Sequence, residues 1–229
     1  MTPQQLVDLR PAGGFACILA DPPWQTKMWS EKGMGRNPDG PAPGYHVTAR
    51  GYGRSSKTAH APERHYRTMA LDELKALPVP LVAADNCVLL MWAIDSHLRQ
   101  AMDLAEHWGF AYKTVGFYWA KQRRTTSTRG RRFADWAHRI FPMSTGYWTR
   151  ANPEQCLLFT RGKPGRLPDA TDIRKLVVAP RREHSRKPDR VIRDIERLVA
   201  GPRLEMFART ARPGWAAWGD EVGRFDAAA

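Results

Sequence analysis

The chain has 229 residues, the size of one α/β domain, and a hydrophobic content of 42% that is ample for a folded core. Its 36 basic residues outnumber 23 acidic ones, and the formal charge of +13 favours a polyanionic partner over a small neutral one. Because no stretch reaches the about 20 apolar residues of a membrane span and residues 1–11 lack a signal-peptide pattern, we expect a cytoplasmic protein.

The cysteines and histidines give no sign of a disulfide set or a metal site. Cys17, Cys87 and Cys156 lie far apart, each in an apolar run, which predicts small buried thiols in a reducing compartment. The seven histidines show no spacing typical of metal ligands. We therefore expect a chemistry that needs no bound metal.

Short apolar runs alternate with helical patterns along the chain. Apolar residues recur at helical spacing at 96–108 and 189–199, and a shorter helical pattern covers 71–77. Runs typical of strands lie at 15–20, 87–93, 112–120, 155–160, 176–179, 204–208 and 215–218. This alternation predicts an α/β fold with a mostly parallel sheet flanked by helices.

The first strand candidate ends at the tetrapeptide Asp21-Pro22-Pro23-Trp24. Open α/β sheets bind ligands at the carboxyl ends of their strands, so the tetrapeptide lies where a ligand is expected. Two prolines fix an acid and an indole relative to each other. The alternative interpretation is a plain proline turn with a capping Asp and a packed Trp.

The chemistry that suits this tetrapeptide is methyl transfer to the exocyclic amine of adenine. That amine is a poor nucleophile because its lone pair is delocalised into the ring. A carboxylate from Asp21 and the carbonyl of Pro22 can each accept one N6 hydrogen bond and so free the lone pair. The ring of Trp24 offers a face for the base, and such stacking is worth about 1–3 kcal/mol.

Two stretches interrupt the alternation, at 25–64 and 122–145, and we expect both to be insertions in a single domain of residues 1–229. The first follows the tetrapeptide and suits a lid or a nucleic-acid contact. The second begins in a segment, 121–132, with six basic residues and no acid, followed by aromatic residues. Its candidate DNA-contact residues are Arg123, Arg124, Arg129, Arg131 and Arg132. The alternative for both stretches is a solvated insertion.

Many further fragments complete a resemblance. In chain order they are ADPPW at 20–24, HYRTM at 65–69, LLMW at 89–92, WGF at 108–110, WAK at 119–121, TGYW at 145–148, Glu154, REHSRKP at 182–188, LEMFAR at 204–209 and GWAAWGDE at 214–221. The chain resembles the N6-adenine methyltransferases related to the catalytic subunit of the eukaryotic messenger-RNA adenosine methyltransferase. Within this family, its sequence most resembles the compact bacterial and phage members that act on DNA.

The resemblance implies a Rossmann-like methyltransferase fold that uses S-adenosylmethionine, with the catalytic turn placed before the cofactor strand. It assigns catalysis to Asp21, Pro22, Pro23 and Trp24. The cofactor-binding residues that it implies are Asp21, Lys187, Glu205, Phe207, Arg209, Asp220 and Glu221. The substrate-binding residues that it implies are Trp24, Tyr66, Trp119, Lys121, Glu154, His184 and Ser185, beside the arginines of the second insertion.

Local patterns agree with part of this assignment. Pro188 opens a helix, so Lys187 lies at a helix N-terminus, where donors and the dipole favour a carboxylate. Glu205 and Arg209 flank the end of a short apolar strand, a common place for a nucleotide ligand. Asp220 stands where most relatives have Asn. The glycine-rich cofactor loop of many methyltransferases is replaced by residues 207–210, and no pocket for the cofactor adenine can be assigned.

The sequence thus predicts an S-adenosylmethionine-dependent DNA adenine-N6 methyltransferase that flips its target base out of the stack. Two alternatives stay open: an RNA adenosine methyltransferase and a non-catalytic nucleic-acid-binding subunit. The pattern is compatible with a monomer or a homodimer.

Overall fold

The computed structural model describes residues 1–25, 45–48, 51–54, 68–123, 140–142, 148–182 and 186–226. It divides into two compact units, one of Met1–Pro22 with Leu74–Ala229 and one of Pro23–Glu73. The smaller unit contains an antiparallel pair, β2 (Tyr45–Thr48) and β3 (Gly51–Arg54), and an isolated bridge between Trp24 and Met69.

The larger unit is built on a seven-stranded sheet with the order β7-β5-β6-β4-β1-β8-β9. Its strands are β1 (Phe15–Ala20), β4 (Ala83–Ala93), β5 (Ala111–Gln122), β6 (Pro153–Arg161), β7 (Leu176–Pro180), β8 (Arg203–Met206) and β9 (Trp215–Trp218). β6 runs antiparallel to both of its neighbours, and every other neighbouring pair in this sheet is parallel. The predicted α/β fold with a mostly parallel, Rossmann-like sheet is confirmed.

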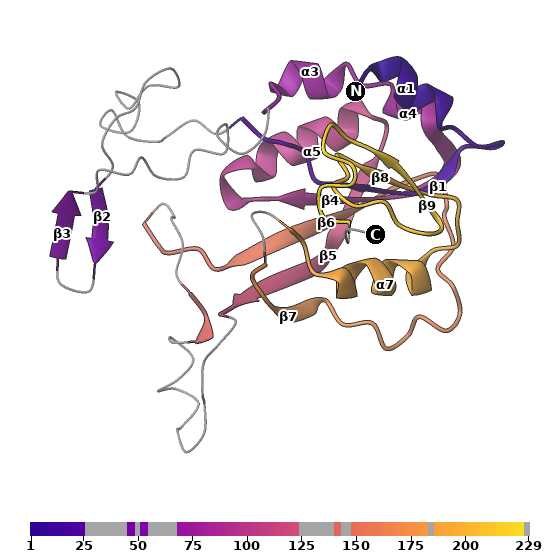
Figure 1. Cartoon of the computed structure of the whole chain (residues 1–229). Coiled ribbons are helices and arrows are strands. Elements are labelled where there is room, and N and C mark those ends of the chain that lie inside the picture. The colour runs from indigo at the N-terminus through magenta and orange to yellow at the C-terminus, as the bar shows by residue number, and fades with distance from the viewer. Residues whose placement is uncertain are drawn as a thin grey trace. The chain divides into compact units, whose positions relative to one another are not determined.

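Helices cover both faces of this sheet. They are α1 (Pro3–Asp8), α4 (Val79–Val82), α5 (Leu98–His107) and α7 (Asp189–Leu198), with a 3₁₀ turn η2 (Asp95–His97) before α5 and α3 (Leu71–Lys75) at the boundary of the units. Figure 1 shows α5 on one side of the strands and α7 on the other. The expected helices at 71–77, 96–108 and 189–199 are therefore present, with shifts of a few residues at their ends.

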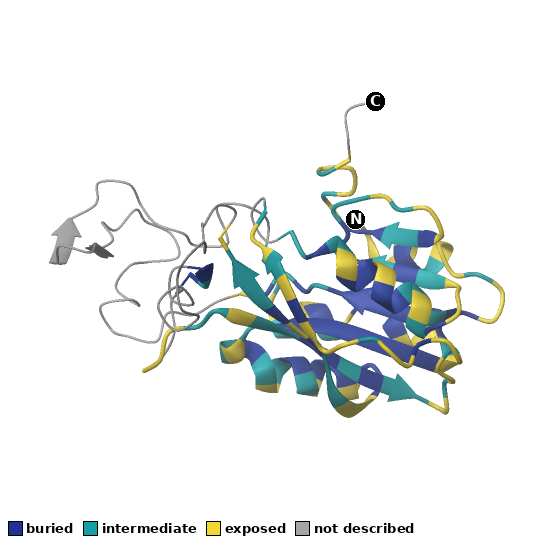
Figure 2. Ribbon diagram, turned by 90° about the horizontal axis from the view of Figure 1, so that it is seen from below, coloured by how far each residue is buried: buried dark blue, intermediate teal, exposed yellow. Residues whose placement is uncertain are grey.

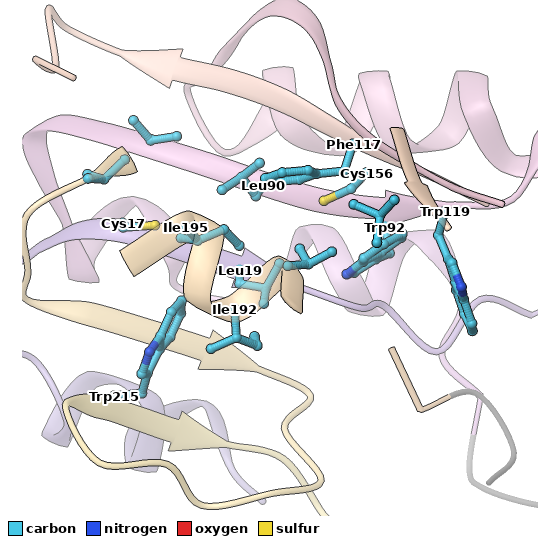
Figure 3. Packing of buried hydrophobic residues seen from close by; sticks show 14 residues of the cluster. Cys17, Leu19, Leu90, Trp92, Phe117, Trp119, Cys156, Ile192, Ile195 and Trp215 are labelled. Carbon is cyan, nitrogen blue, oxygen red and sulfur yellow. The ribbon is translucent and has the colours of Figure 1, made fainter. Parts of the chain in front are cut away.

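α7 packs its apolar face on the central strands. Val191 and Ile195 are at most 1% exposed and belong to the same cluster as Leu19 of β1 and Leu90 and Trp92 of β4. Figure 3 shows Leu19, Ile192 and Ile195 close together at α7. Burying each such side chain stabilises the fold by about 1.5–3 kcal/mol, so this face fixes where α7 begins relative to β1.

The alternate strand residues are buried on the opposite face, because successive side chains of a strand point to opposite sides. Leu89 and Met91 of β4 are fully buried, as are Leu104 and Trp108 at α5. The Trp108 indole donates a hydrogen bond of 3.2 Å to the carbonyl of Leu74. Figure 2 shows the buried positions concentrated in the central strands, between the helices that cover the two faces of the sheet.

The predicted buried thiols are confirmed. Cys17, Cys87 and Cys156 are all free and buried. Burial raises the pKa of all three thiols, that of Cys87 to about 12. Within the described residues there is no group of three or more histidines, cysteines or acids placed to hold a metal ion. None of the helices in the described ranges combines the length and apolar character needed to cross a membrane.

Strand β8 ends earlier than its apolar sequence predicts. Phe207 has a φ of 59°, which lies outside the β region and turns the chain directly after Met206. This turn is covered by Gly219, where an added Cβ would lie 2.6 Å from the main-chain N and O of Ala208. Only glycine therefore lets the end of β9 approach the turn after β8 this closely.

We expect Gly219→Ala to lower the free energy of unfolding by about 1–3 kcal/mol, because the methyl group overlaps backbone that cannot move freely. Urea unfolding measures the change. Gly165→Ala is the matched control, since an added Cβ there meets nothing within 4 Å. Equal stability of the two variants would contradict the close approach of Gly219 to the turn.

Candidate active site

Asp21 lies directly after β1, at the point where the strand order changes direction. β1 has β4 on one side and β8 on the other, and the sheet continues outward from both. A pocket opens at the carboxyl ends of these three strands, and its wall includes Leu19, Asp21, Trp92 and Glu205. Open α/β sheets bind their ligands at such a reversal of strand order.

The Asp21 carboxylate is held by the ammonium group of Lys187. The Lys187 Nζ lies 2.9 Å from Oδ1 and 2.7 Å from Oδ2 of Asp21. Both side chains are mostly covered, with 15% of Lys187 and 28% of Asp21 exposed. The pair joins the end of β1 to the residue before Pro188, which precedes α7.

A second contact, made by Arg182, fixes the chain around Lys187. Arg182 donates from Nη2 to the main-chain carbonyl of Lys187 at 2.7 Å and from Nη1 to Asp189 Oδ2 at 2.6 Å. Asp189 is the first residue of α7. The guanidinium thus ties the segment before the helix to the helix itself, and the position of the Lys187 main chain follows from it.

A largely covered carboxylate, Glu154, is the second partner of Lys187. Its Oε2 lies 3.4 Å from the Lys187 Nζ, and its Oε1 accepts a hydrogen bond from the Nζ of Lys121 at 2.5 Å. Because β6 is antiparallel to β5, the start of β6 lies beside the end of β5, and Glu154 is paired with Trp119. Lys121, Glu154, Lys187 and Asp21 therefore form a row of alternating charges, called here the four-charge row.

The charges in this row stabilise one another. Burial raises the pKa of Glu154, but Lys187 and Lys121 outweigh that effect and leave the pKa below its usual value. Burial likewise disfavours the Lys187 ammonium, but Asp21 and Glu154 outweigh it and raise the pKa of Lys187. Both groups are thus charged at neutral pH despite their burial.

Two indole rings line the row on its apolar side. The Lys187 Nζ lies 5.4 Å from the centroid of the Trp92 ring, and the Lys121 Nζ lies 5.4 Å from that of Trp119. The two rings meet edge to face at 6.5 Å, and Figure 3 shows them side by side. Trp119 is 3% exposed, and its N–H donates to the carbonyl of Ala179 at 3.0 Å. The ring faces add a cation–π attraction for both ammonium groups.

The β8 side of the pocket carries an acid, an aromatic ring and a cation. Glu205 lines the pocket, and burial raises its pKa although Arg212, with its Nε at 3.1 Å, opposes the shift. Phe207 lines it from the turn with positive φ, and its ring packs edge to face on Trp218 at 5.5 Å. Arg209 lines it as well and pairs with Glu221 at 3.1 Å.

The structure therefore brings five of the predicted cofactor-binding residues to one pocket: Asp21, Lys187, Glu205, Phe207 and Arg209. The remaining two are placed differently. Glu221 pairs with Arg209 and Arg224. Asp220 is exposed and contacts the amino group of Met1. Among the described residues that line this pocket, neither Asp220 nor Glu221 is present.

Several predicted substrate-binding residues lie outside the part of the chain that the structure describes: Tyr66, Arg124, Arg129, Arg131, Arg132, His184 and Ser185. Arg123 is exposed after β5, and its main-chain N–H donates to Ile140 at 2.9 Å. Pro23 and Trp24 belong to the smaller unit, where Met69 donates to the Pro23 carbonyl at 2.9 Å. Their predicted roles stay predictions.

Sequence reasoning gave no role to Trp92 and Arg212, which line this pocket, or to Arg182, which holds the main chain of Lys187. Trp92 is the penultimate residue of β4, the strand next to β1, and its place near a strand end was a usable signal. Arg182 lies in a fragment of the resemblance but was given no function. Arg212 lies in the β8–β9 connection, and nothing in the sequence indicates that it contacts both Glu205 and Asp189, at 3.1 and 3.6 Å.

Comparison with known proteins gives consistent matches. The MT-A70 family profile matches residues 15–221. The type II methyltransferase M.MunI of a Mycoplasma species is 32% identical over 93% of this chain and 79% of its own length. An N(6)-adenosine-methyltransferase MT-A70-like protein of Drosophila melanogaster is 27% identical over 95% of this chain and 28% of its own. The human N(6)-adenosine-methyltransferase catalytic subunit METTL3 is 25% identical over 94% of this chain and 30% of its own.

The lowered pKa of Glu154 predicts how acid affects stability. The ionised Glu154 stabilises the fold above the unfolded-state value of about 4.3, and that contribution is lost as pH falls through the lower folded-state pKa. We expect Glu154→Gln to lower the free energy of unfolding at neutral pH and to flatten its fall as the pH drops below the unfolded-state value of about 4.3. Urea unfolding at a series of pH values measures both effects.

The matched control for that series is Glu106→Gln, an exposed carboxylate on α5. Its curve of unfolding free energy against pH is expected to follow that of the parent protein. A Glu154→Gln curve that runs parallel to the parent curve through the acid range would show that the two lysines do not stabilise the Glu154 carboxylate.

Proposed function

The chain belongs to the MT-A70 family, and from this membership we propose that it methylates the N6 amine of adenine in DNA, using S-adenosylmethionine. The predicted family and the methyltransferase class are confirmed by the match over residues 15–221. The observation that carries the proposal for this chain is the pocket beside Asp21, which gathers Lys187, Glu205, Phe207 and Arg209 at the carboxyl ends of the strands.

The residues of this pocket fit the proposed cofactor in their chemistry. Lys187 and Arg209 suit a carboxylate or ribose oxygens, and Asp21 and Glu205 suit an ammonium or a sulfonium. Leu19 and Phe207 add apolar surface for the remaining atoms. The positive φ of Phe207 is a strained backbone position, and such strain recurs at ligand sites. When bound, the cofactor supplies an electrophilic methyl group.

Asp21 and Pro22 prepare the nucleophile. The carboxylate of Asp21 and the main-chain carbonyl of Pro22 each accept a hydrogen bond from the adenine amine, which draws its lone pair out of the ring. The Asp21 charge then stabilises the positive charge that develops on nitrogen, so a strong base is not required. Trp24 supplies the proposed stacking surface for the base.

Three features support DNA as the substrate. The formal charge of +13 favours a polyanion. M.MunI, matched over 79% of its own length, is a type II methyltransferase, the class that modifies DNA. In contrast, the chain covers 28% of the Drosophila adenosine methyltransferase and 30% of human METTL3. In a duplex the adenine is paired and stacked and cannot enter a pocket, so we also propose that the base is flipped into the site.

The proposed arrangement is one methyltransferase domain over residues 1–229 with insertions at 25–64 and 122–145. The basic residues of the second insertion would contact the phosphate backbone, and the first would contact DNA or cover the site. These contacts position a strand without reading its sequence, so the proposal specifies no target site.

We expect Asp21→Ala to reduce methyl transfer to DNA by at least about 100-fold while leaving DNA affinity within a factor of about two, because Asp21 acts on the amine and not on the backbone. Transfer of a labelled methyl group and fluorescence anisotropy with labelled DNA measure the two effects. Asp103→Ala, at an exposed acid of α5, is the control and keeps the parental rate. Labelled transfer by Asp21→Ala at the parental rate would remove Asp21 from the mechanism.

The choice of DNA over RNA is tested by competition. We expect the enzyme to methylate a DNA oligonucleotide in preference to the RNA of matched sequence when both are present at equal concentration. The 2′-hydroxyl is the main difference between the two oligonucleotides at one site, so the competition tests whether the enzyme discriminates between them. The labelled product is separated by strand type and counted. Preferential labelling of the RNA would contradict DNA as the substrate and would show that the enzyme acts on adenosine in RNA.

A further inference from the structure

We propose that Lys121 is a positioning residue of the active site, which holds Glu154 so that Glu154 shares the Lys187 ammonium with Asp21. The inference rests on the proposed function, because it concerns Asp21, whose carboxylate is proposed to accept a hydrogen bond from the target amine. It gives Lys121 a role different from the substrate contact implied by the resemblance. Lys121 then acts through two other side chains and need not touch DNA.

The ammonium of Lys187 lies between two acids. It contacts both oxygens of Asp21, at 2.7 and 2.9 Å, and one oxygen of Glu154 at 3.4 Å. An ammonium has three donors, and a carboxylate has about four lone-pair sites. Two of the Lys187 donors serve the two oxygens of Asp21, and Glu154 takes up the third. Lys187 therefore has no further donor for Asp21, and the remaining acceptor sites of that carboxylate are left for the amine.

Glu154 can take up the third donor of Lys187 only while it is ionised and fixed in place. Its side chain is 17% exposed, so water stabilises its charge only in part. The Nζ of Lys121 donates to its Oε1, which leaves Oε2 to face Lys187. Without Lys121, two carboxylates would share a single ammonium, and one of them would tend to take up a proton.

Lys121 itself is firmly placed and is largely withdrawn from solvent. Its side chain is 18% exposed, and its ammonium lies over the buried ring of Trp119 at 5.4 Å. Its main-chain carbonyl accepts a hydrogen bond of 2.9 Å from Asn152 Nδ2, which also donates to Pro142 at 2.8 Å. These contacts suit a fixed support for Glu154 better than a mobile contact to phosphate.

The first test compares three variants in methyl transfer at saturating DNA and cofactor. We expect Lys121→Met to lower kcat by about 10- to 100-fold, the effect of losing one charged hydrogen bond. Lys121→Arg, which keeps the charge, restores most of the rate. Lys113→Met is the matched control, an exposed lysine on the same strand, and keeps the parental rate. The dissociation constant for DNA and its salt dependence stay unchanged in all three.

The second test uses a double-mutant cycle. Because Lys121 acts through Glu154, adding Lys121→Met to Glu154→Gln is expected to cost no further activity. Independent, multiplicative losses would overturn the proposal. So would a Lys121→Met variant with parental kcat, or one whose loss appears as weaker DNA binding with a flatter salt dependence, since Lys121 would then contact DNA directly. Should Lys121→Met fail to fold, Lys121→Gln takes its place with the same outcomes.

A third readout needs neither cofactor nor DNA. The charged groups that face Glu154 or its partner are Lys121 on β5, Lys187 before α7, Asp21 after β1 and Arg209 after β8, while the Cys156 thiol stays neutral. We expect carbon NMR titration of the Glu154 carboxyl to give a higher pKa in Lys121→Met than in the parent protein. An unchanged pKa would overturn the inference even if the enzyme methylates DNA. A parent protein that fails to methylate DNA would contradict the proposed function. The titration would still test, independently, whether Lys121 holds Glu154 in its ionised form.

Discussion

The ion pair between Asp21 and Lys187 is the contact on which the rest of the site depends. The two residues are 166 positions apart in the chain, so the pair forms only if β1 ends and α7 begins at the same edge of the sheet. The apolar packing of α7 on Leu19 and Leu90 places the helix there. A slip of β1 by one residue would turn its inward side chains to the other face and separate the pair.

The single antiparallel strand of the sheet has a specific effect on this site. If β6 ran parallel to β5, its first residues would lie at the opposite edge of the sheet. Because it runs antiparallel, Glu154 near its start lies beside Trp119 near the end of β5, and its carboxylate reaches both lysines. One reversed strand thus places a largely covered acid, from its first residues, at the edge where the parallel strands end.

The sequence allowed a correct prediction of the strand before Asp21 and of the helix after Lys187, because both depend on local signals. A continuous apolar run stops at the tetrapeptide, and Pro188 opens a helix with a clear apolar face. The contacts of Glu154 could not be predicted, since they depend on the register between β5 and β6, and no local sequence pattern determines that register. The early end of β8 has a similar origin: Phe207 is a residue typical of strands, and only the tertiary setting gives it a positive φ.

The four-charge row has consequences for the response to ionic strength. Its two positive and two negative groups are separated by contacts of 2.5–3.4 Å, well inside the screening length of about 10 Å at 0.1 M salt, and they are shielded from solvent. The excess charge of the whole chain, in contrast, acts over long distances. Added electrolyte therefore slows the encounter with a polyanion while leaving the arrangement of these four groups intact, so association and the geometry of the pocket respond to it separately.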